Sequence, residues 1–434
     1  MNAKFSFLSL LLIVLFSAQI SIANESAAML ARKVVSEDPA EAKVAIEELR
    51  ALGPEGLEAL LTEYVDHINV HIKAPRIVET PEWERIATAL DQVGQQKNNY
   101  ISGLYWYTDL DAARKVARES GKPILSLRLL GNLTDDLSCA NSRFFRTVLY
   151  PNAQVRDVLR NRFVLHWKSV RPAPRITVDF GDGRKLERTV TGNSIHYILD
   201  SDGRLVEAIP GLYGPQAFKR ELERGETLAR SLAGATEQQR VSLLQKHCTE
   251  RSSEIFSGWT YDTKQFGDKL SPRLRVRPTQ GRDALTIGPI AATKMSTESP
   301  MVRAITSASD AMGRLTDEEA WRLIARLHQN DAVLDERSRS LMTRQNRSLS
   351  EKEWYRMFLR FSESIAMDTV RNEYMLRPML YSWLASSRSA DLEKFNEWVY
   401  AEVFATPSSD PWLGLVAPEI YVAVDNGGAT PKGQ

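Results

Sequence analysis

The segment LTDDLSCANSRFFRTVL, residues 133–149, contains Cys139, one of only two cysteines in this chain of 434 residues. The residues after Cys139 predict a helix that begins near Ser142. A thiol at the start of a helix is acidified by the aligned backbone N–H groups, and the thiolate is the form that attacks disulfides. Cys139 is therefore a candidate nucleophile for thiol–disulfide exchange.

The charges beside Cys139 act on this thiol in opposite directions. Arg143 and Arg146 favour the thiolate, whereas Asp135 and Asp136 favour the neutral thiol. The sequence does not give the sign of the net effect. It leaves Cys139 open between a reactive monothiol and a buried, inert thiol, since cysteine is among the residue types most often buried.

A disulfide is a third interpretation of Cys139. The other cysteine is Cys248, and a bond between the two would join the loop to a helix that we expect to end near His247. Ser142 also has two interpretations. From the residues alone the N-cap of the helix is the expected role, because it is the commoner role of a serine at a helix start; a second role follows from a resemblance described below.

The histidines are weaker candidates for chemistry. His67 and His71 are four residues apart, a spacing that places two side chains on one helix face and suits a metal ion. They lack the glutamate of the zincin arrangement and a nearby cysteine. We therefore expect structural roles and predict neither a metal nor a cofactor. His196 falls on a strand near the thiol and is expected to be packed rather than to act as a base.

The scaffold for these residues is predicted between residues 100 and 232, where strand and helix patterns alternate. In chain order we expect a short strand (GLYWYTD), a helix ending at Gly121, a buried strand (PILSLRLL), the loop with Cys139, a helix interrupted at Pro151 and a strand (RFVLHWKSV). A strand with a GDG turn, a hairpin of SIHYILD and RLVEAIPG, and a final helix follow.

Helices are predicted on both sides of this scaffold. Residues 25–99 carry two amphipathic stripes separated by the helix-breaking GPEG, an arrangement that resembles one HEAT-type helical hairpin. Residues 249–308 are rich in Ser, Thr, Gly and Pro and predict an irregular connector. Residues 309–405 predict a helical C-terminal domain, and residues 406–434 predict a disordered tail.

The N-terminus predicts export. Lys4 precedes the apolar run FSFLSLLLIVLF, and the small residues Ser21 and Ala23 follow, which is the layout of a signal peptide over residues 1–23. A net charge of +1 and a hydrophobic content of 43% favour a folded, soluble protein without a nucleic-acid partner. We therefore expect a periplasmic or extracellular protein with no stable membrane insertion after signal cleavage.

The region from 100 to 232 resembles the thioredoxin-like superfamily. SGKPILSLRLL, followed by the loop with Cys139, is similar to the strand before the family's redox motif, and GNSIHYILDSDGRLVEAIPG is similar to the hairpin opposite that motif. The residues from LSCANS to LHWKSV also resemble the region of selenoprotein N around its Ser-Cys-Sec-Gly motif. The resemblance implies a redox centre at Cys139, with Ser142 and Ser194 at two cooperating positions.

Three residues depart from the pattern that this resemblance implies. Ser142 stands where a dithiol thioredoxin has its second cysteine, and Ala140 stands where selenoprotein N has selenocysteine. Ser194 stands where the family has a cis-proline facing the thiol, and a cis bond is costly without proline. The hallmarks of dithiol catalysis are therefore missing from their expected positions.

The predicted fold class is α+β with several domains. A central thioredoxin-like α/β/α domain is expected between an N-terminal HEAT-like α-hairpin and a C-terminal all-α domain. The sequence favours a non-catalytic scaffold or protein-interaction role with an unidentified protein partner. The alternative is an enzyme, a monothiol oxidoreductase that uses Cys139 as its nucleophile.

Overall fold

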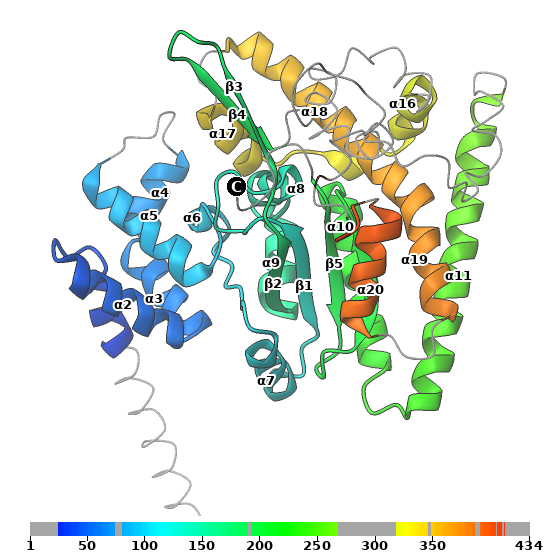
Figure 1. The fold of residues 1–434 in the computed structure, drawn as a ribbon, viewed down its shortest axis with the longest axis horizontal. Coiled ribbons are helices and arrows are strands. Elements are labelled where there is room, and N and C mark those ends of the chain that lie inside the picture. Colours follow the sequence, from blue (N-terminus) through cyan, green and yellow to red (C-terminus); the bar gives the residue numbers. More distant parts are fainter. Residues whose placement is uncertain are drawn as a thin grey trace, which may run out of the picture.

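The computed structural model describes residues 25–73, 80–189, 192–267, 318–345, 349–386, 391–404, 406–409 and 412. These residues form a mixed α+β structure in which many helices surround a small mixed sheet (Figure 1). The predicted signal peptide, most of the predicted connector and most of the predicted tail lie outside the described residues. Among the helices described, none combines the length and apolar character that crossing a membrane requires.

Helices form the N-terminal part of the chain. They are residues 25–33, α2 (Pro39–Ala51), α3 (Pro54–Glu63), α4 (Val65–Lys73), α5 (Pro81–Gly94) and α6 (Asn99–Ser102). The side chains of Asp38 and Thr80 accept hydrogen bonds from backbone N–H groups of the first turn and so cap α2 and α5. These helices enclose an apolar core of their own, to which Leu341 is added from the C-terminal part. The helical prediction for residues 25–99 is confirmed over these elements.

The helices α2 and α3 touch at Gly56. A Cβ atom there would lie 1.9 Å from the carbonyl oxygen of Leu49, so the approach requires glycine. We expect Gly56→Ala to lower the free energy of unfolding by about 1–3 kcal/mol, because the two helices must move apart. Urea denaturation measures the change, with the exposed neighbour Glu55→Ala as the control. Equal stability of the two variants would contradict this packing.

The central sheet has four strands in the order β2-β1-β5-β6. They are β1 (Ile124–Leu130), β2 (Val164–Arg171), β5 (Ser194–Leu199) and β6 (Leu205–Pro210). β1 and β2 run parallel, whereas β5 is antiparallel to both β1 and β6. The predicted strand GLYWYTD contributes only an isolated bridge between Tyr107 and His166.

Helices connect these strands, as predicted. α7 (Leu110–Ser120) precedes β1, and α10 (Pro215–Ser231) follows β6. Between β1 and β2 lie α8 (Ala140–Phe144), the π-helical turn η1 (Phe145–Leu149) and α9 (Ala153–Arg162). The predicted interruption at Pro151 is confirmed, because this residue lies between η1 and α9.

The two faces of the sheet are covered by different elements. His196 of β5 packs against Phe145 of η1 and Phe218 of α10. Successive strand residues point to opposite faces, and Tyr197 donates a hydrogen bond to Asn396 of α20 (Leu392–Trp398). A helix 199 residues further along the chain therefore covers the second face (Figure 1).

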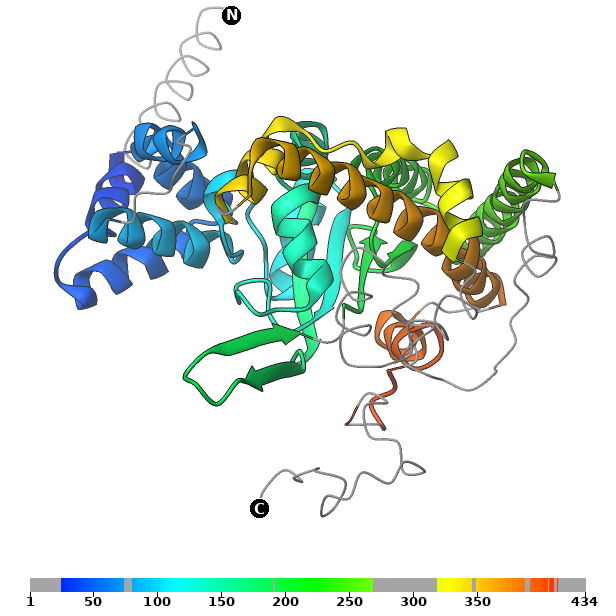
Figure 2. The same ribbon diagram turned by 90° about the horizontal axis from the view of Figure 1, so that it is seen from above.

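The strands β3 (Arg175–Asp179) and β4 (Lys185–Thr189) form a separate two-stranded antiparallel sheet between β2 and β5 in the chain. Gly181 and Gly183 have positive φ in the turn that joins them, so the predicted GDG hairpin is confirmed. This hairpin, which we call the arm, projects from the body of the molecule (Figures 1 and 2).

The structure differs from the predicted boundaries after α10. α11 (Glu237–Lys264) continues well past His247, so residues 249–264 are helical rather than part of an irregular connector. The remaining elements are α16 (Glu318–Leu327), η3 (Gln329–Ala332), α17 (Glu336–Gln345), α18 (Glu351–Arg371), η4 (Asn372–Leu376), α19 (Arg377–Ser386), α20 and η5 (Val399–Val403). Most of their buried apolar side chains belong to the same core as the sheet, whereas Leu341 of α17 belongs to the core of the N-terminal helices. α19 packs on α11, and α20 packs on the sheet. Within the described residues of 318–404, most of the buried apolar side chains therefore lie in the core that contains the sheet.

Candidate functional site

Cys139 lies in the loop between β1 and α8. Its backbone N–H donates to the carbonyl of Leu130 at 3.2 Å, and its Sγ accepts a hydrogen bond from the Ser142 N–H at 3.4 Å. The helix therefore begins earlier than the sequence predicts, and Cys139 rather than Ser142 is its N-cap. The exposed fraction of Cys139 is 0%. In this conformation the thiol is not accessible to a disulfide substrate.

The other two predicted site residues lie close to this loop. The Ser142 hydroxyl is hydrogen-bonded to that of Ser138 at 2.7 Å. The side-chain amide of Asn141 donates to the Ser194 hydroxyl at 2.9 Å, which ties the loop to the start of β5. The side chains of these four hydrogen-bonding residues, two from each pair, are all buried. The peptide bond before Ser194 is trans. The structure thus brings Cys139, Ser142 and Ser194 into one neighbourhood, where the two serines bind to the protein itself.

Two arginines hold the same loop in place. Arg146 Nη2 donates to the carbonyl of Asp135 at 3.0 Å and to the Ser138 hydroxyl at 3.2 Å. Burial lowers the pKa of Arg146 to about 10. Arg143 donates to the Thr189 hydroxyl of β4 at 2.9 Å, and burial lowers its pKa as well. Both cations therefore have structural partners.

The C-terminal segment lies over this neighbourhood. The Tyr400 hydroxyl donates to the carbonyl of Asn193, and the Asn193 amide donates to the Thr406 hydroxyl at 2.9 Å. Arg171 of β2 donates to the carbonyl of Thr406 at 2.9 Å. Thr406, the first residue of the predicted disordered tail, is 1% exposed and so belongs to the folded body.

The third interpretation of Cys139, a disulfide with Cys248, does not hold in this structure, where both residues are buried thiols. Cys248 lies on α11, beside Glu207 of β6. Burial, followed by the charge of Glu207, raises the pKa of Cys248 to about 12, which makes it an inert thiol.

The histidines have packing roles. The His71 ring stacks on Trp83 with a centroid distance of 3.6 Å, and His67 lies 3.8 Å from Glu82. His196 is fully buried, and burial lowers its pKa to about 3. No group of three or more side chains suited to a metal ion occurs in the part of the chain that the structure describes.

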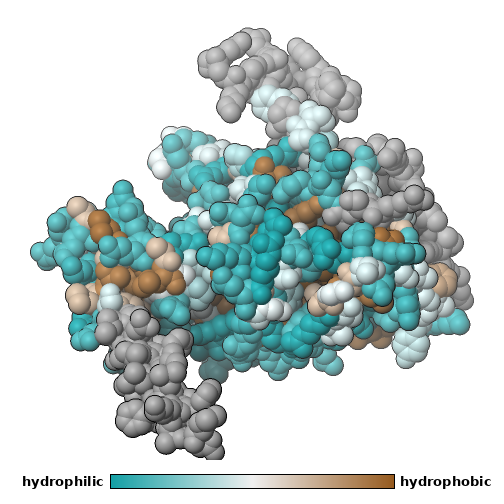
Figure 3. Space-filling view, turned by 90° about the horizontal axis from the view of Figure 1, so that it is seen from below, coloured by the Kyte–Doolittle hydropathy of each residue, from teal (hydrophilic) through white to brown (hydrophobic). Residues whose placement is uncertain are grey.

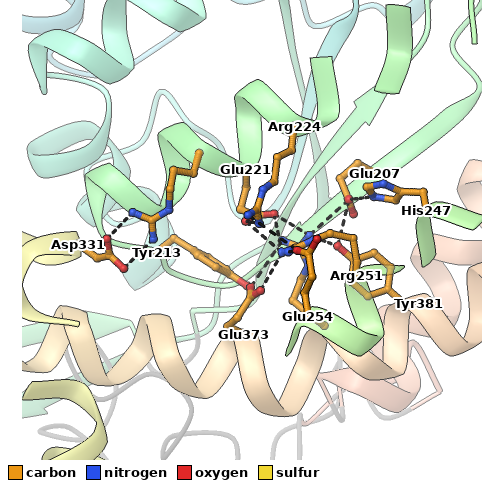
Figure 4. Close-up of polar contacts among 12 residues, drawn as sticks. Glu207, Tyr213, Glu221, Arg224, His247, Arg251, Glu254, Asp331, Glu373 and Tyr381 are labelled. Carbon is orange, nitrogen blue, oxygen red and sulfur yellow. Dashed lines mark hydrogen bonds and ion pairs between the residues drawn. The ribbon is translucent and has the colours of Figure 1, made fainter. Parts of the chain in front are cut away.

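A buried ionic network is the second polar site of the molecule (Figure 4). It comprises Glu207 of β6, Tyr213, Glu221 of α10, His247 and Arg251 of α11, Glu373 of η4, and Arg377 and Tyr381 of α19. It was not predicted from the sequence.

Arg377 is the centre of this ionic network. Its side chain is fully buried, and its Nη2 lies 2.9 Å from Glu221 Oε2 and 3.4 Å from Glu207 Oε2. Glu207 also accepts hydrogen bonds from His247 Nε2 at 2.8 Å and from the Tyr381 hydroxyl at 3.1 Å. One cation therefore connects the sheet, α10 and α19.

Arg251 is the second cation of the network. Its Nη2 lies 3.2 Å from Glu221 Oε1 and 3.0 Å from Glu373 Oε1. Glu373 also accepts a hydrogen bond from the Tyr213 hydroxyl at 3.1 Å. The cations are shared unequally, because Glu221 also accepts a hydrogen bond from the exposed Arg224 at 2.9 Å, whereas Glu373 shares Arg251 with Glu221 and with the exposed Glu254.

Because the cations are shared unequally, the three carboxyl groups of the network have different pKa values. Burial alone would raise the pKa of Glu207, but the charge of Arg377 and the hydrogen bond from His247 hold it at about 2. Burial also opposes the charged form of Glu221, yet Arg377 and Arg251 lower its pKa. Burial dominates at Glu373 and raises its pKa. Glu373 is therefore the carboxyl group of the network that protonates most readily.

A surface hollow of about 520 Å³ lies between α10 and α11, next to the network. Most of its lining residues are of charged types, and they include Arg224, Arg251 and Glu254, with His247 beside them. The three carboxyl groups of the network are not among its lining residues. His247 and Arg251 therefore reach the hollow, whereas Glu207 and Glu221 are 1% and 5% exposed and lack the access that a catalytic acid–base pair needs. The geometry of the network suits the joining of β6, α10, α11, η4 and α19.

The sequence does contain a signal for such buried charges. Glu207 in RLVEAIPG and Arg128 in PILSLRLL are charged residues inside otherwise apolar strands. Both are 1% exposed, and Arg128 is paired with Glu393 of α20 at 3.0 Å. A charge in a buried strand requires a partner, but the local pattern does not identify that partner.

Comparisons of the chain with models of known families, with curated proteins and with solved structures found no match. The residues of the chain and their geometry are therefore the basis for a proposal about function.

Proposed function

We propose that this chain is an exported, non-catalytic protein-interaction protein whose central sheet belongs to a degenerate thioredoxin-like domain. The observation that carries the proposal is the complete burial of Cys139. Thiol exchange requires the sulfur to reach a disulfide in line, and a thiol without exposed surface does not do so.

The order of elements supports the thioredoxin-like part of the proposal. From α7 to α10 the chain forms a helix, a strand, helices, a strand, the arm, a hairpin and a helix. Cys139 follows β1 and precedes α8, which is the position that the resemblance implies for a redox centre. The arm is an insertion in this order.

The contacts around Cys139 support a non-catalytic role. Ser142 and Ser194, at the two cooperating positions, are hydrogen-bonded to Ser138 and Asn141. The Cys139 sulfur itself accepts the N–H of Ser142 as a helix cap. Each group at the former redox position thus stabilises the loop.

Exposed apolar side chains support an interaction role. Figure 3 shows hydrophobic surface, in brown, over the N-terminal helices. The large apolar residues exposed in this region are Met29, Val44, Leu52, Val65 and Val70. Protein partners cover surfaces of this kind, and we propose a protein partner, still unidentified, for them.

Thiol labelling tests the proposal. In Cys248→Ala, iodoacetamide should modify Cys139 at least about 10³-fold more slowly in the folded protein than in guanidinium chloride, because the reagent gains access only through unfolding. Mass spectrometry of the peptides measures the modification. Cys139→Ala retains Cys248 and reports the labelling of a buried thiol elsewhere in the same protein.

Fast labelling of Cys139 in folded Cys248→Ala would contradict the proposal and favour monothiol exchange. The Cys139 thiolate would then attack one sulfur of glutathione disulfide, form a mixed disulfide and release the other glutathione as a thiolate. A mass increase equal to one glutathione less two hydrogens on the folded protein would identify this reaction.

A further inference from the structure

The arm has two chemically different faces. On β3, Arg175, Thr177 and Asp179 point to one face, and Ile176 and Val178 point to the other. Val178 is 40% exposed, and neither Ile176 nor Val178 belongs to the apolar cores or to the side chains packed against them. The apolar face of the arm is therefore not covered within the described residues. A two-stranded sheet without cover is marginally stable in water.

The outer edge of β3 presents backbone groups for pairing. The Phe180 N–H donates to the carbonyl of Arg184, which lies opposite to it. Hydrogen-bonded and non-hydrogen-bonded pairs alternate along an antiparallel ladder. The backbone N–H and C=O groups of Ile176 and Val178 therefore bond to β4. Those of Arg175, Thr177 and Asp179 point away from β4, toward the outer edge. Within the described residues, β4 is the one strand paired with β3.

The sequence of β3, RITVD, is complementary to itself in the antiparallel direction. If two copies of β3 pair about Thr177, Arg175 of each copy lies opposite Asp179 of the other on the polar face. Ile176 lies opposite Val178 of the other copy on the apolar face. The three outward-facing residues then form hydrogen-bonded pairs, with unlike charges at both ends.

The edge of β4 lacks this complementarity. Its sequence, KLERT, places Glu187 opposite Glu187 of a second copy when two β4 strands pair about that residue. Like charges directly opposite each other are destabilising. Edge pairing therefore favours β3.

We propose that this protein forms a homodimer in which β3 of each copy pairs antiparallel with β3 of the other, giving a four-stranded sheet in the order β4-β3-β3-β4. The faces that carry Ile176, Val178 and Leu186, with Arg188 opposite Ile176, become one continuous surface across the two copies. The two-fold pairing covers the β3 edge of each copy, so the contact between β3 strands closes at two copies.

Sedimentation velocity of the full mature chain over a range of concentrations tests the dimer. The wild type should show a reversible monomer–dimer equilibrium. Arg175→Glu places Glu opposite Asp179 at both ends and should weaken dimerisation by at least about tenfold. The double variant Arg175→Asp with Asp179→Arg exchanges the two charges and should restore it. Arg188→Glu makes the same charge change on β4 and is the matched control.

Thr177→Pro provides a second test that does not depend on charge. It removes an N–H that points away from β4, so the arm retains its own ladder while the dimer edge is blocked. Circular dichroism and the thermal midpoint should match the wild type, and the protein should be monomeric. The inference is wrong if the wild type is monomeric at every concentration, or if Thr177→Pro dimerises as tightly as the wild type.

Discussion

Arg377→Met should lower the free energy of unfolding by about 3–5 kcal/mol at neutral pH. The side chain of Arg377 is fully buried and lies between Glu221 and Glu207, at 2.9 and 3.4 Å. Methionine fills a similar volume but removes the cation. Glu207 then keeps its hydrogen bonds from His247 and Tyr381 but no longer has that cation, and Glu221 loses the same fully buried partner. Urea denaturation followed by tryptophan fluorescence measures the loss.

Arg224→Met is the matched control for this substitution. Arg224 also donates to Glu221, at 2.9 Å, but 45% of its side chain is exposed. Water therefore replaces its contribution, and the expected cost is less than about 1 kcal/mol. If the two variants lost the same stability, the buried position of Arg377 would have no special importance, and the network would not hold β6, α10 and α19 together.

The scaffold around Cys139 was predictable because its signals are local. The buried strand PILSLRLL, the break at Pro151 and the GDG turn depend on residues that are neighbours in the chain, and each has its counterpart in β1, in the gap between η1 and α9, and in the arm. Burial of Cys139 was one of three open interpretations. Tyr400 and Thr406, which help to cover this neighbourhood, lie more than 200 residues after their partner Asn193. A local sequence pattern does not predict contacts of that separation.

The wrong predictions have related causes. Residues 249–264 contain serine, threonine and glycine, which favour loops on their own, but α19 packs along α11 and keeps them helical. The start of α11 has a recognisable signal, a capping box formed by Thr236 and Gln239. The ionic network was missed because its members come from five separate elements. In its local sequence pattern, each of these charged residues predicts a position at the surface, because its partner lies in a different element.

Glu207→Gln should reduce the loss of unfolding free energy that the wild type shows as the pH falls from 6 to 3. The pKa of Glu207 is about 2 in the folded protein and 4.5 as its usual value. A carboxyl group with a lowered pKa contributes stability above its usual pKa and loses that contribution as the pH falls toward the folded value. Between pH 6 and pH 3 the wild type should therefore lose about 2 kcal/mol through this group alone. Glutamine does not titrate, so the variant lacks that loss.

The comparison requires urea denaturation of both proteins at pH 6 and pH 3. Glu207→Gln is expected to be less stable than the wild type at pH 6, because Arg377 loses a charged partner, and to approach the wild type at pH 3. Glu221 acts in the same direction as Glu207, whereas Glu373, with a raised pKa, stabilises the protein at low pH and loses that contribution as the pH rises. Glu223→Gln, at the surface of α10, is the control and should follow the wild type at both pH values. A stability gap between Glu207→Gln and the wild type that stays constant from pH 6 to pH 3 would show that Glu207 is not held ionised by Arg377 and His247.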